Sequence, residues 1–310
     1  MKIEYTLKDN ECGLTLKTIL KDRLYVSNIL RYNLIKYNKV TVNQKLVHLS
    51  DKLDVNDTIS VILDSITDVN SSTLSFSDKF DSINDLTSLN ILYEDEYLLI
   101  VNKKSNMPSH PSCNNYKNTL SNIVHTYLKK QNIDTIHLIT RLDKNTSGIC
   151  IFAKHKYIQE LFIRKKEQIK LVKKYLAIVY GTDIEDHGII KKNIIRDENS
   201  IILRRTCDDT TGDFAKTEYY TISRNYKDNY SVLEIILHTG RTHQIRVHMS
   251  SINHPLLGDD LYRNKCTENE IRKLISRQAL HAYEITLNHP ITNATIKIKA
   301  PIPDDIKKLI

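Results

Sequence analysis

The sequence predicts an α+β protein in which a small basic module precedes a larger domain built on a β-sheet. Apolar residues recur at helical spacing between residues 14 and 35. They alternate with polar residues along Tyr230–Leu237 and along residues 294–300, as in strands with one buried face. A polar stretch separates the two parts. A chain of 310 residues is long enough for two unequal domains.

Residues 1–63 form the predicted module. Two short helices lead into a strand at residues 40–43, and residues 53–62 indicate a turn and a further strand. The expected core positions are Leu14, Leu16, Ile19, Leu20, Val26, Ile29, Leu30, Leu34 and Ile35. Between residues 20 and 45 a single acid, Asp22, stands against a cluster of cations. These are Lys21, Arg23, Arg31, Lys36, Lys39 and Lys45.

A polar linker is expected at residues 64–88, ahead of a domain spanning residues 89–310. Of its 25 residues, 17 are Ser, Thr, Asn or Asp, which is too polar a composition to form a core. A second basic concentration follows an amphipathic run in the larger domain, and it suits either phosphate contact or an ordinary solvated helix face. Its members are Arg164, Lys165, Lys166, Lys170, Lys173 and Lys174.

Composition limits the classes of protein to which this chain can belong. Hydrophobic residues make up 40% and charged residues 26%, as in a soluble globular protein, and no apolar run approaches a membrane span. The five cysteines contain no C-x-x-C pair, so we expect free thiols, a reducing cytoplasmic location and no structural zinc. A net charge of +8 favours a polyanionic partner. We expect a monomer.

The most informative stretch runs from Arg141 to Gly148 and places Asp143 beside a cation and before a small-residue turn. The apolar run at residues 149–153 predicts a buried strand that anchors this loop. A carboxylate held on a short loop suits a reacting group. The alternative is a surface Arg–Asp pair of little energetic weight.

Residues 244–249 alternate in the manner of a strand. On that reading Gln244, Arg246 and His248 share one face of the strand, opposite the apolar side that faces the core. Arg246 would then face a substrate cleft, where it could keep a partly buried carboxylate ionised and oriented. The alternative is a salt bridge at the rim. His238 and His248 would then lie opposite His243, which argues against a metal site.

The ordered motifs of residues 89–303 resemble those of the RluA family of RNA pseudouridine synthases. The segment T-R-L-D-K-N-T-S-G-I-C-I-F-A-K is similar to the family signature H-R-L-D-x-x-T-S-G, with Thr140 in place of the usual His. Upstream, the usual Lys-Pro-x-Gly turn is Lys103-Lys104-Ser105-Asn106, in which Asn106 is best able to adopt positive φ. The tyrosine motif at residues 174–181, T-G-R-T-H-Q-I-R-V-H-M, H-P-L-L-G-D and L-H-A-Y complete the match.

The resemblance implies a mixed, largely antiparallel sheet and an S4-type RNA-binding fold for residues 1–63, whose basic cluster would contact RNA. It further implies that Asp143 is the catalytic group, that Arg246 pairs with it and that Tyr175 stacks on the target base. Arg141 is similar to the family residue that holds the flipped position. The residues alone leave open a core tyrosine at 175, a loop salt bridge at Arg141 and, for residues 1–63, a basic capping domain of unrelated fold.

Isomerising uridine requires no group donor and no redox change, and the chain contains neither a nucleotide-cofactor motif nor a zinc-ligand set, so we expect no cofactor. Asp143 could attack as a nucleophile or remove a sugar proton. The substrate would be large-subunit ribosomal RNA, with transfer RNA as the alternative. Two rival functions are a catalytically silent RNA-binding protein and a hydrolase that pairs Asp143 with a second acid such as Glu94 or Asp95.

Overall fold

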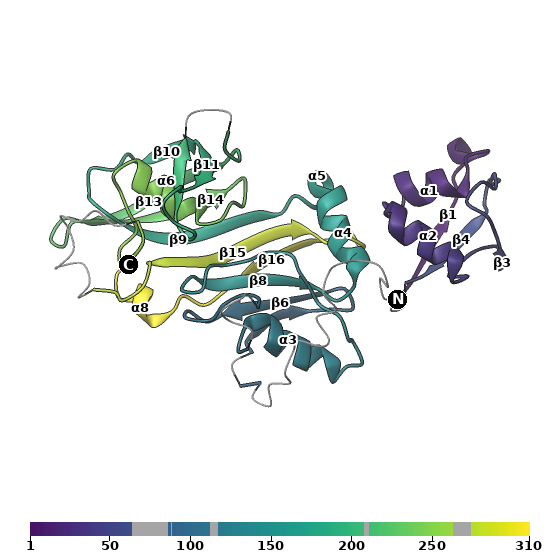
Figure 1. Ribbon diagram of the computed structural model, residues 1–310, viewed down its shortest axis with the longest axis horizontal. Helices are drawn as coiled ribbons and strands as arrows, with labels where there is room; N and C mark the ends of the chain where they lie inside the picture. Colours follow the sequence, from purple (N-terminus) through teal and green to yellow (C-terminus); the bar gives the residue numbers. More distant parts are fainter. Residues whose placement is uncertain (64–85, 88, 112–116, 208–210, 263–273) are drawn as a thin grey trace. The chain divides into compact units, whose positions relative to one another are not determined.

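A computed structural model of the chain describes residues 1–63, 86–87, 89–111, 117–207, 211–262 and 274–310 (Figure 1). Almost all of the predicted linker therefore lies outside the described residues. The described residues form two compact units. One takes its residues from 1–76 and 155–167, and the other from 77–154 and 168–310.

The first unit contains the antiparallel sheet β1-β4-β2-β3 and two helices. Its strands are β1 (Lys2–Thr6), β2 (Val40–Val42), β3 (Lys45–Leu46) and β4 (Thr58–Ile62), and η1 (Asp9–Glu11) is a short 3-10 turn. Helix α1 (Leu16–Asp22) begins where the Thr15 hydroxyl accepts a hydrogen bond from the Thr18 amide, and α2 (Asn28–Lys36) begins at Ser27 in the same way. The two helices predicted from apolar spacing are confirmed.

The core of the first unit contains most of the predicted apolar residues. Leu16, Ile19, Leu20 and Leu34 are fully buried. The prediction is wrong for Ile29, whose side chain is 68% exposed because the first turn of α2 directs it to solvent. Helix α4 (Lys156–Arg164) also belongs to this unit. The buried Tyr157 hydroxyl of α4 donates to the Leu24 carbonyl at 2.7 Å.

The second unit is built on a ten-stranded sheet in the order β10-β13-β14-β9-β15-β8-β6-β5, with β16 beside β15 and β7 beside β8 (Figure 1). All its pairings are antiparallel except that of β15 with β8, so the predicted mixed, largely antiparallel sheet is confirmed. The strands are β5 (Ile91–Glu94), β6 (Leu98–Lys103), β7 (His137–Leu138), β8 (Ser147–Ala153), β9 (Val172–Tyr180), β10 (His187–Lys191), β13 (Lys216–Asn225), β14 (Tyr230–Leu237), β15 (Leu280–Asn288) and β16 (Thr295–Lys299). A separate hairpin pairs β11 (Asn193–Arg196) with β12 (Arg204–Cys207).

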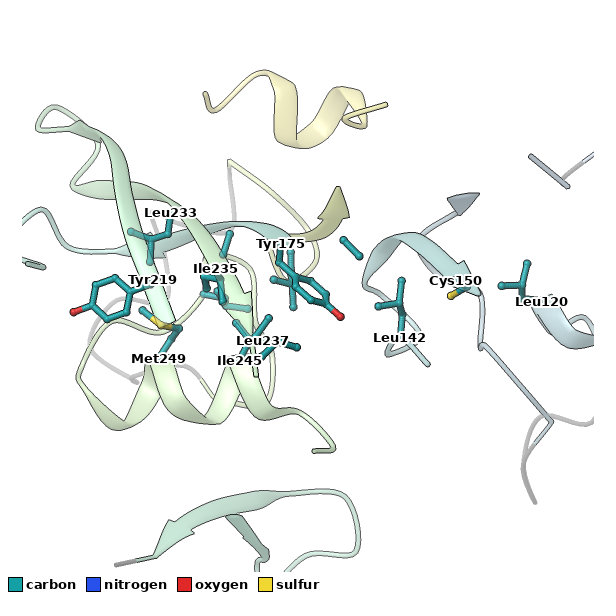
Figure 2. Packing of buried hydrophobic residues seen from close by; sticks show 14 of the residues in the cluster. Leu120, Leu142, Cys150, Tyr175, Tyr219, Leu233, Ile235, Leu237, Ile245 and Met249 are labelled. Atoms are coloured by element: carbon teal, nitrogen blue, oxygen red, sulfur yellow. The ribbon is translucent and has the colours of Figure 1, made fainter. Parts of the chain in front are cut away.

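Strand β8 is buried throughout and β9 is buried from residue 175 to 179, in keeping with their long apolar runs. On one face α3 (Leu120–Lys129) and α6 (Gln244–Ser251) pack over residues that include Cys150, Tyr175 and Ile235 (Figure 2). On the other face α8 (Asp304–Lys307) packs through Ile306 against β9 and β14. The short α5 (Lys166–Ile169) leads into β9. Among the described residues, no helix is long and apolar enough to cross a membrane.

The prediction of a strand at residues 244–249 is wrong, because these residues begin α6. Ile245 and Met249, four residues apart, share the helix face that packs on the sheet. Val247 lies on another side, against Ile194 and Ala215. A helix that is buried on two sides places apolar residues at every second position over six residues, which imitates strand alternation.

Candidate active site

Asp143 lies on the loop between β7 and β8, and the backbone of this loop is held from several sides. Ser109 accepts from the Leu142 amide at 3.1 Å and donates to the Leu142 carbonyl at 2.6 Å. The Thr146 amide closes a turn on the Asp143 carbonyl at 3.1 Å. The Thr140 hydroxyl accepts from the Ile151 amide at 3.0 Å, so the residue that replaces the usual His is itself a loop anchor.

Lys103 fastens this loop to the turn that follows β6. Its side chain is buried, and its ammonium donates to the carbonyls of Lys104, Met107 and Lys144 at 2.9, 2.8 and 3.0 Å. Asn106 has a φ of 59°, which confirms the predicted positive φ in a turn without glycine. Burial lowers the pKa of Lys103 to about 8. All three ammonium donors are used when the group is charged.

Arg277 holds the other end of the loop. Its guanidinium donates to the Asn145 carbonyl at 3.0 Å and forms a two-point ion pair with Asp305, with N–O distances of 2.6 and 2.9 Å. Asp305 belongs to α8. The loop is thus connected to the C-terminal helix through one buried side chain.

The Asp143 carboxylate meets Arg246, although α6 rather than a strand carries that arginine. Arg246 Nη1 lies 3.2 Å from Asp143 Oδ2, while Nε and Nη2 donate to both oxygens of Asp259 at 2.7 and 2.8 Å. Burial opposes the charge, but hydrogen bonds to Asp259 and Asp143 and their charges raise the pKa of Arg246. The Asp143 side chain is 26% exposed and that of Arg246 is 6% exposed, so the carboxylate is the member of the pair that solvent reaches.

His243 approaches the same oxygen, with Nε2 3.9 Å from Asp143 Oδ2. It precedes α6 and has a φ of 58°, in the left-handed region. Burial lowers the pKa of His243, against the opposing charge of Asp143. The imidazole is therefore neutral at neutral pH.

Tyr175 lies on β9, and its side chain belongs to the same buried cluster as Leu142 of the Asp143 loop. Its neighbours across the strands are Ile235 and Ala282, and Leu142 belongs to the same cluster. In Figure 2 the Tyr175 hydroxyl is directed to the side on which Leu142 lies. Burial raises the pKa of Tyr175, which therefore stays a neutral phenol. The ring is 6% exposed, so Tyr175 occupies a buried position in this cluster.

The remaining predicted residues are more dispersed. Arg141 is exposed on the same loop as Asp143. In the first unit Lys21, Arg23, Lys36 and Lys45 are exposed and Lys39 is half-buried, although Arg23 pairs with the buried Glu11. Arg31 differs, because it is buried, it donates to the Val26 carbonyl at 2.6 Å, and it bonds to Asn28.

The histidines and acids of the rival interpretations have other partners. His238 pairs with Glu218 at 2.8 Å, and His248 bonds to Thr217 at 2.8 Å. Within the described ranges, no cluster of His, Cys, Asp or Glu could hold a metal ion. Glu94 bonds to Lys154 and Tyr127, and Asp95 bonds to Tyr93. Neither acid forms a pair with Asp143. Cys12 and Cys150 are free thiols, and Cys113 and Cys266 lie outside the described residues.

Comparison with known proteins identifies the family. The profile of the RNA pseudouridylate synthase family matches residues 97–251. The chain is 38% identical over 223 residues to the uncharacterized RNA pseudouridine synthase YjbO of Bacillus subtilis, covering 72% of this chain and 75% of that one. The chain belongs to the RluA family of RNA pseudouridine synthases. It is thus an isomerase.

Three further similarities are with two curated relatives and one solved structure. YhcT, also an uncharacterized RNA pseudouridine synthase of Bacillus subtilis, is 32% identical over 309 residues, with 99% of this chain and 96% of that one covered. Ribosomal large subunit pseudouridine synthase D of Blochmanniella floridana is 39% identical, with 72% of each chain covered. The fold is similar to human RNA pseudouridylate synthase domain containing 1, with a TM-score of 0.56, 23% identity, and 72% and 87% of the two chains covered.

The structure adds residues that sequence reasoning did not single out. Lys103, Asp259, Tyr262 and Arg277 all contact the Asp143 loop or its partners. A signal was available for Lys103, since a charged residue ending the apolar run of β6 must find buried partners. Asp259 and Tyr262 lie within or just after the H-P-L-L-G-D motif, but no spacing rule connects them with Arg246.

Proposed function

We propose that this RNA pseudouridine synthase isomerises specific uridines of large-subunit ribosomal RNA, with Asp143 as its catalytic group. The observation that carries the proposal is the solvent-reachable Asp143 carboxylate, paired with a buried arginine on a loop anchored by Lys103 and Arg277. Relatives named ribosomal large subunit pseudouridine synthase D, at 33 to 39% identity over most of this chain, support the choice of RNA.

The arrangement suits the chemistry of the reaction. The N1–C1′ bond breaks, the uracil turns and C5 joins C1′. C5 loses its proton to water and N1 takes up a proton, so the product is an isomer of the substrate. Asp143 acts on the sugar or base as a nucleophile, or it takes a proton from the sugar. Either role requires a carboxylate of fixed direction, and the ion pair with Arg246 provides one.

The target uridine must leave its stack to reach Asp143, because base chemistry of this kind is blocked inside a duplex. The exposed Arg141, two residues before Asp143, would occupy the vacated position. Tyr175 would present its ring to the flipped base, after a small opening of the contacts that now bury it. An intact Asp143–Arg246 pair argues against a catalytically silent protein.

The first unit would supply additional RNA affinity. We assign this role to the accessible cations Lys21, Arg23, Lys36, Lys39 and Lys45 and leave out Arg31, whose guanidinium is bonded within the unit. The two helices packed on a small sheet fit the S4-type module that the sequence resembles. We further propose that the protein acts in the cytoplasm as a monomer and needs no cofactor.

Tritium release tests the substrate. RNA labelled with tritium at uracil C5 loses the label to water when C5 becomes the glycosidic carbon. We expect release from unmodified large-subunit ribosomal RNA without added metal or nucleotide, at a stoichiometry that matches a few sites. Release from transfer RNA alone would refute the ribosomal assignment. Retention of tritium in both RNAs would refute the proposed activity on either RNA.

A further inference from the structure

We infer that His243, oriented by Tyr262, is a second positioning residue for Asp143 and directs an N–H at the carboxylate oxygen that Arg246 also contacts. This inference rests on the proposed catalytic role of Asp143. His243 Nε2 lies 3.9 Å from Asp143 Oδ2, and Arg246 Nη1 lies 3.2 Å from the same oxygen. The histidine distance exceeds a hydrogen bond by roughly 1 Å. Catalytic hydrogen bonds are often long without substrate and shorten when it binds.

The hydrogen bonds of Tyr262 determine which ring nitrogen carries the proton. The Arg204 amide, which can only donate, lies 2.9 Å from the Tyr262 hydroxyl oxygen, so that oxygen accepts. The phenolic proton is then free to donate to His243 Nδ1 at 2.8 Å. A neutral imidazole that accepts at Nδ1 carries its proton on Nε2. The N–H therefore faces Asp143.

Tyr262 supports both partners of the carboxylate. The guanidinium carbon of Arg246 lies 5.1 Å from the centre of its ring, and the His243 ring meets that ring edge-on at 5.6 Å. One tyrosine thus stacks on one partner of Asp143 and bonds to the other. Its hydroxyl is in turn fixed by a backbone amide at the start of β12.

The backbone at His243 bears on the choice of test substitutions. Its φ of 58° and ψ of 17° lie in the left-handed region, which asparagine and histidine enter more readily than glutamine does. Of the two amides, Asn therefore suits the backbone at residue 243 better than Gln.

Two amide substitutions separate the positioning role from a structural one. Gln places an amide nitrogen near the position of Nε2 and keeps a donor toward Asp143. Asn reaches only the position of Nδ1 but suits the backbone better. We expect His243→Asn to lose turnover at saturating RNA by about tenfold to a hundredfold, the worth of one hydrogen bond to a charged group, and His243→Gln to lose several-fold less. Thermal unfolding should rank the two variants in the opposite order, and RNA affinity should change little in both.

Tyr262→Phe keeps the ring beside Arg246 and removes the hydroxyl. Tyr262→Phe should lower turnover when residue 243 is His. It should have little effect in the His243→Gln variant, because Gln has no Nδ1 to accept the Tyr262 hydroxyl proton. The effects of the two substitutions should therefore be strongly non-additive. His238→Gln and His238→Asn are matched controls, because His238 lies in the same loop between β14 and α6 but pairs with Glu218 and not with Asp143. The turnover of both variants should stay within about twofold of the parent.

Turnover that is equal or higher in His243→Asn than in His243→Gln, or additive effects of Tyr262→Phe, would overturn the inference. An Asp143→Asn variant measured in parallel keeps this failure distinct from failure of the proposed function. If that variant is inactive while Asn outperforms Gln, only the role of His243 is refuted. If that variant turns over normally, the catalytic role of Asp143 is refuted.

Discussion

At the residue scale, the site depends on a few buried cations that are each hydrogen-bonded to several partners. Lys103, Arg246 and Arg277 are each nearly excluded from solvent, and each contacts the Asp143 loop or the carboxylate itself. Removing one partner of such a group leaves the other buried and unsatisfied, which costs more than a surface contact would. We therefore expect the loop to be sensitive to changes at residues that never touch the substrate.

The charge state of Lys103 should make turnover depend on pH. Its pKa is lowered to about 8 by burial, so the ammonium is complete at pH 7 and loses a proton as the pH rises through about 8. The neutral amine has two donors for three carbonyls, and its lone pair would face one of them. We expect turnover to fall on the alkaline side with a midpoint near pH 8, measured between pH 6 and 10.

The control for this measurement is Lys104→Met, since Lys104 is exposed and contributes only its backbone carbonyl to the contact. Its profile should follow that of the parent, whereas Lys103→Met should have low turnover at every pH. A parent profile that stays flat to pH 10 would show that the charge on Lys103 is not required.

At the element scale, the start of β8 determines where the Asp143 loop ends. Gly148 has a φ of 113° and pairs with Ala282 of β15, in the one parallel pairing among the described strands of the sheet. A Cβ at this position would collide with the backbone of Ala282. The strand can approach β15 only because this residue has no side chain.

Gly148→Ala should therefore lower the free energy of unfolding by at least about 2 kcal/mol, combining the left-handed backbone penalty with overpacking. Gly13→Ala is the matched control, because Gly13 also has a positive φ, of 79°, but its Cβ would meet open space. Denaturant unfolding of both variants measures the difference. Equal losses would show that the approach to Ala282 is not the cause.

The elements also show where sequence reasoning succeeds and where it stops. The strand at residues 149–153 and the positive φ at Asn106 followed from local chemistry, and both are confirmed. Residues 244–249 were misassigned because a helix buried on two sides imitates a strand over six residues. The pairings of Arg246 with Asp259 and of Arg277 with Asp305 were out of reach, since no local pattern specifies which buried charges meet.

At the scale of the whole molecule, the two units divide the work of binding and chemistry in our proposal. The first unit contains the accessible cations Lys21, Lys36 and Lys45, and the second contains Asp143. Helix α4 belongs to the first unit although its sequence interrupts the second. Deleting residues 1–63 would remove the carbonyl to which Tyr157 donates, so substitution tests the basic surface more cleanly than truncation does.

Changing Lys21, Lys36 and Lys45 together to Gln should weaken RNA binding and flatten its salt dependence. The slope of log affinity against log salt is negative, and it becomes shallower by about 0.7 to 0.9 for every phosphate that the protein no longer neutralises. Loss of three such contacts should therefore make it shallower by about 2 to 3. Titration of a ribosomal RNA fragment at several salt concentrations measures the slope. The control variant changes Lys227, Lys307 and Lys308 to Gln. These lysines are also exposed, and their substitution removes the same amount of charge. Equal slopes in the two variants would contradict an RNA-binding role for the first unit.

The central claim, that Asp143 performs the chemistry, is tested most directly by Asp143→Asn, which keeps the size of the side chain but removes its charge and basicity. We expect tritium release at saturating RNA to fall by at least about a thousandfold while RNA affinity stays near that of the parent. Asp134→Asn, a change to an exposed acid shortly before β7, should leave both unchanged. Turnover of Asp143→Asn within about tenfold of the parent, a difference of only about 1.4 kcal/mol in the barrier, would contradict the account.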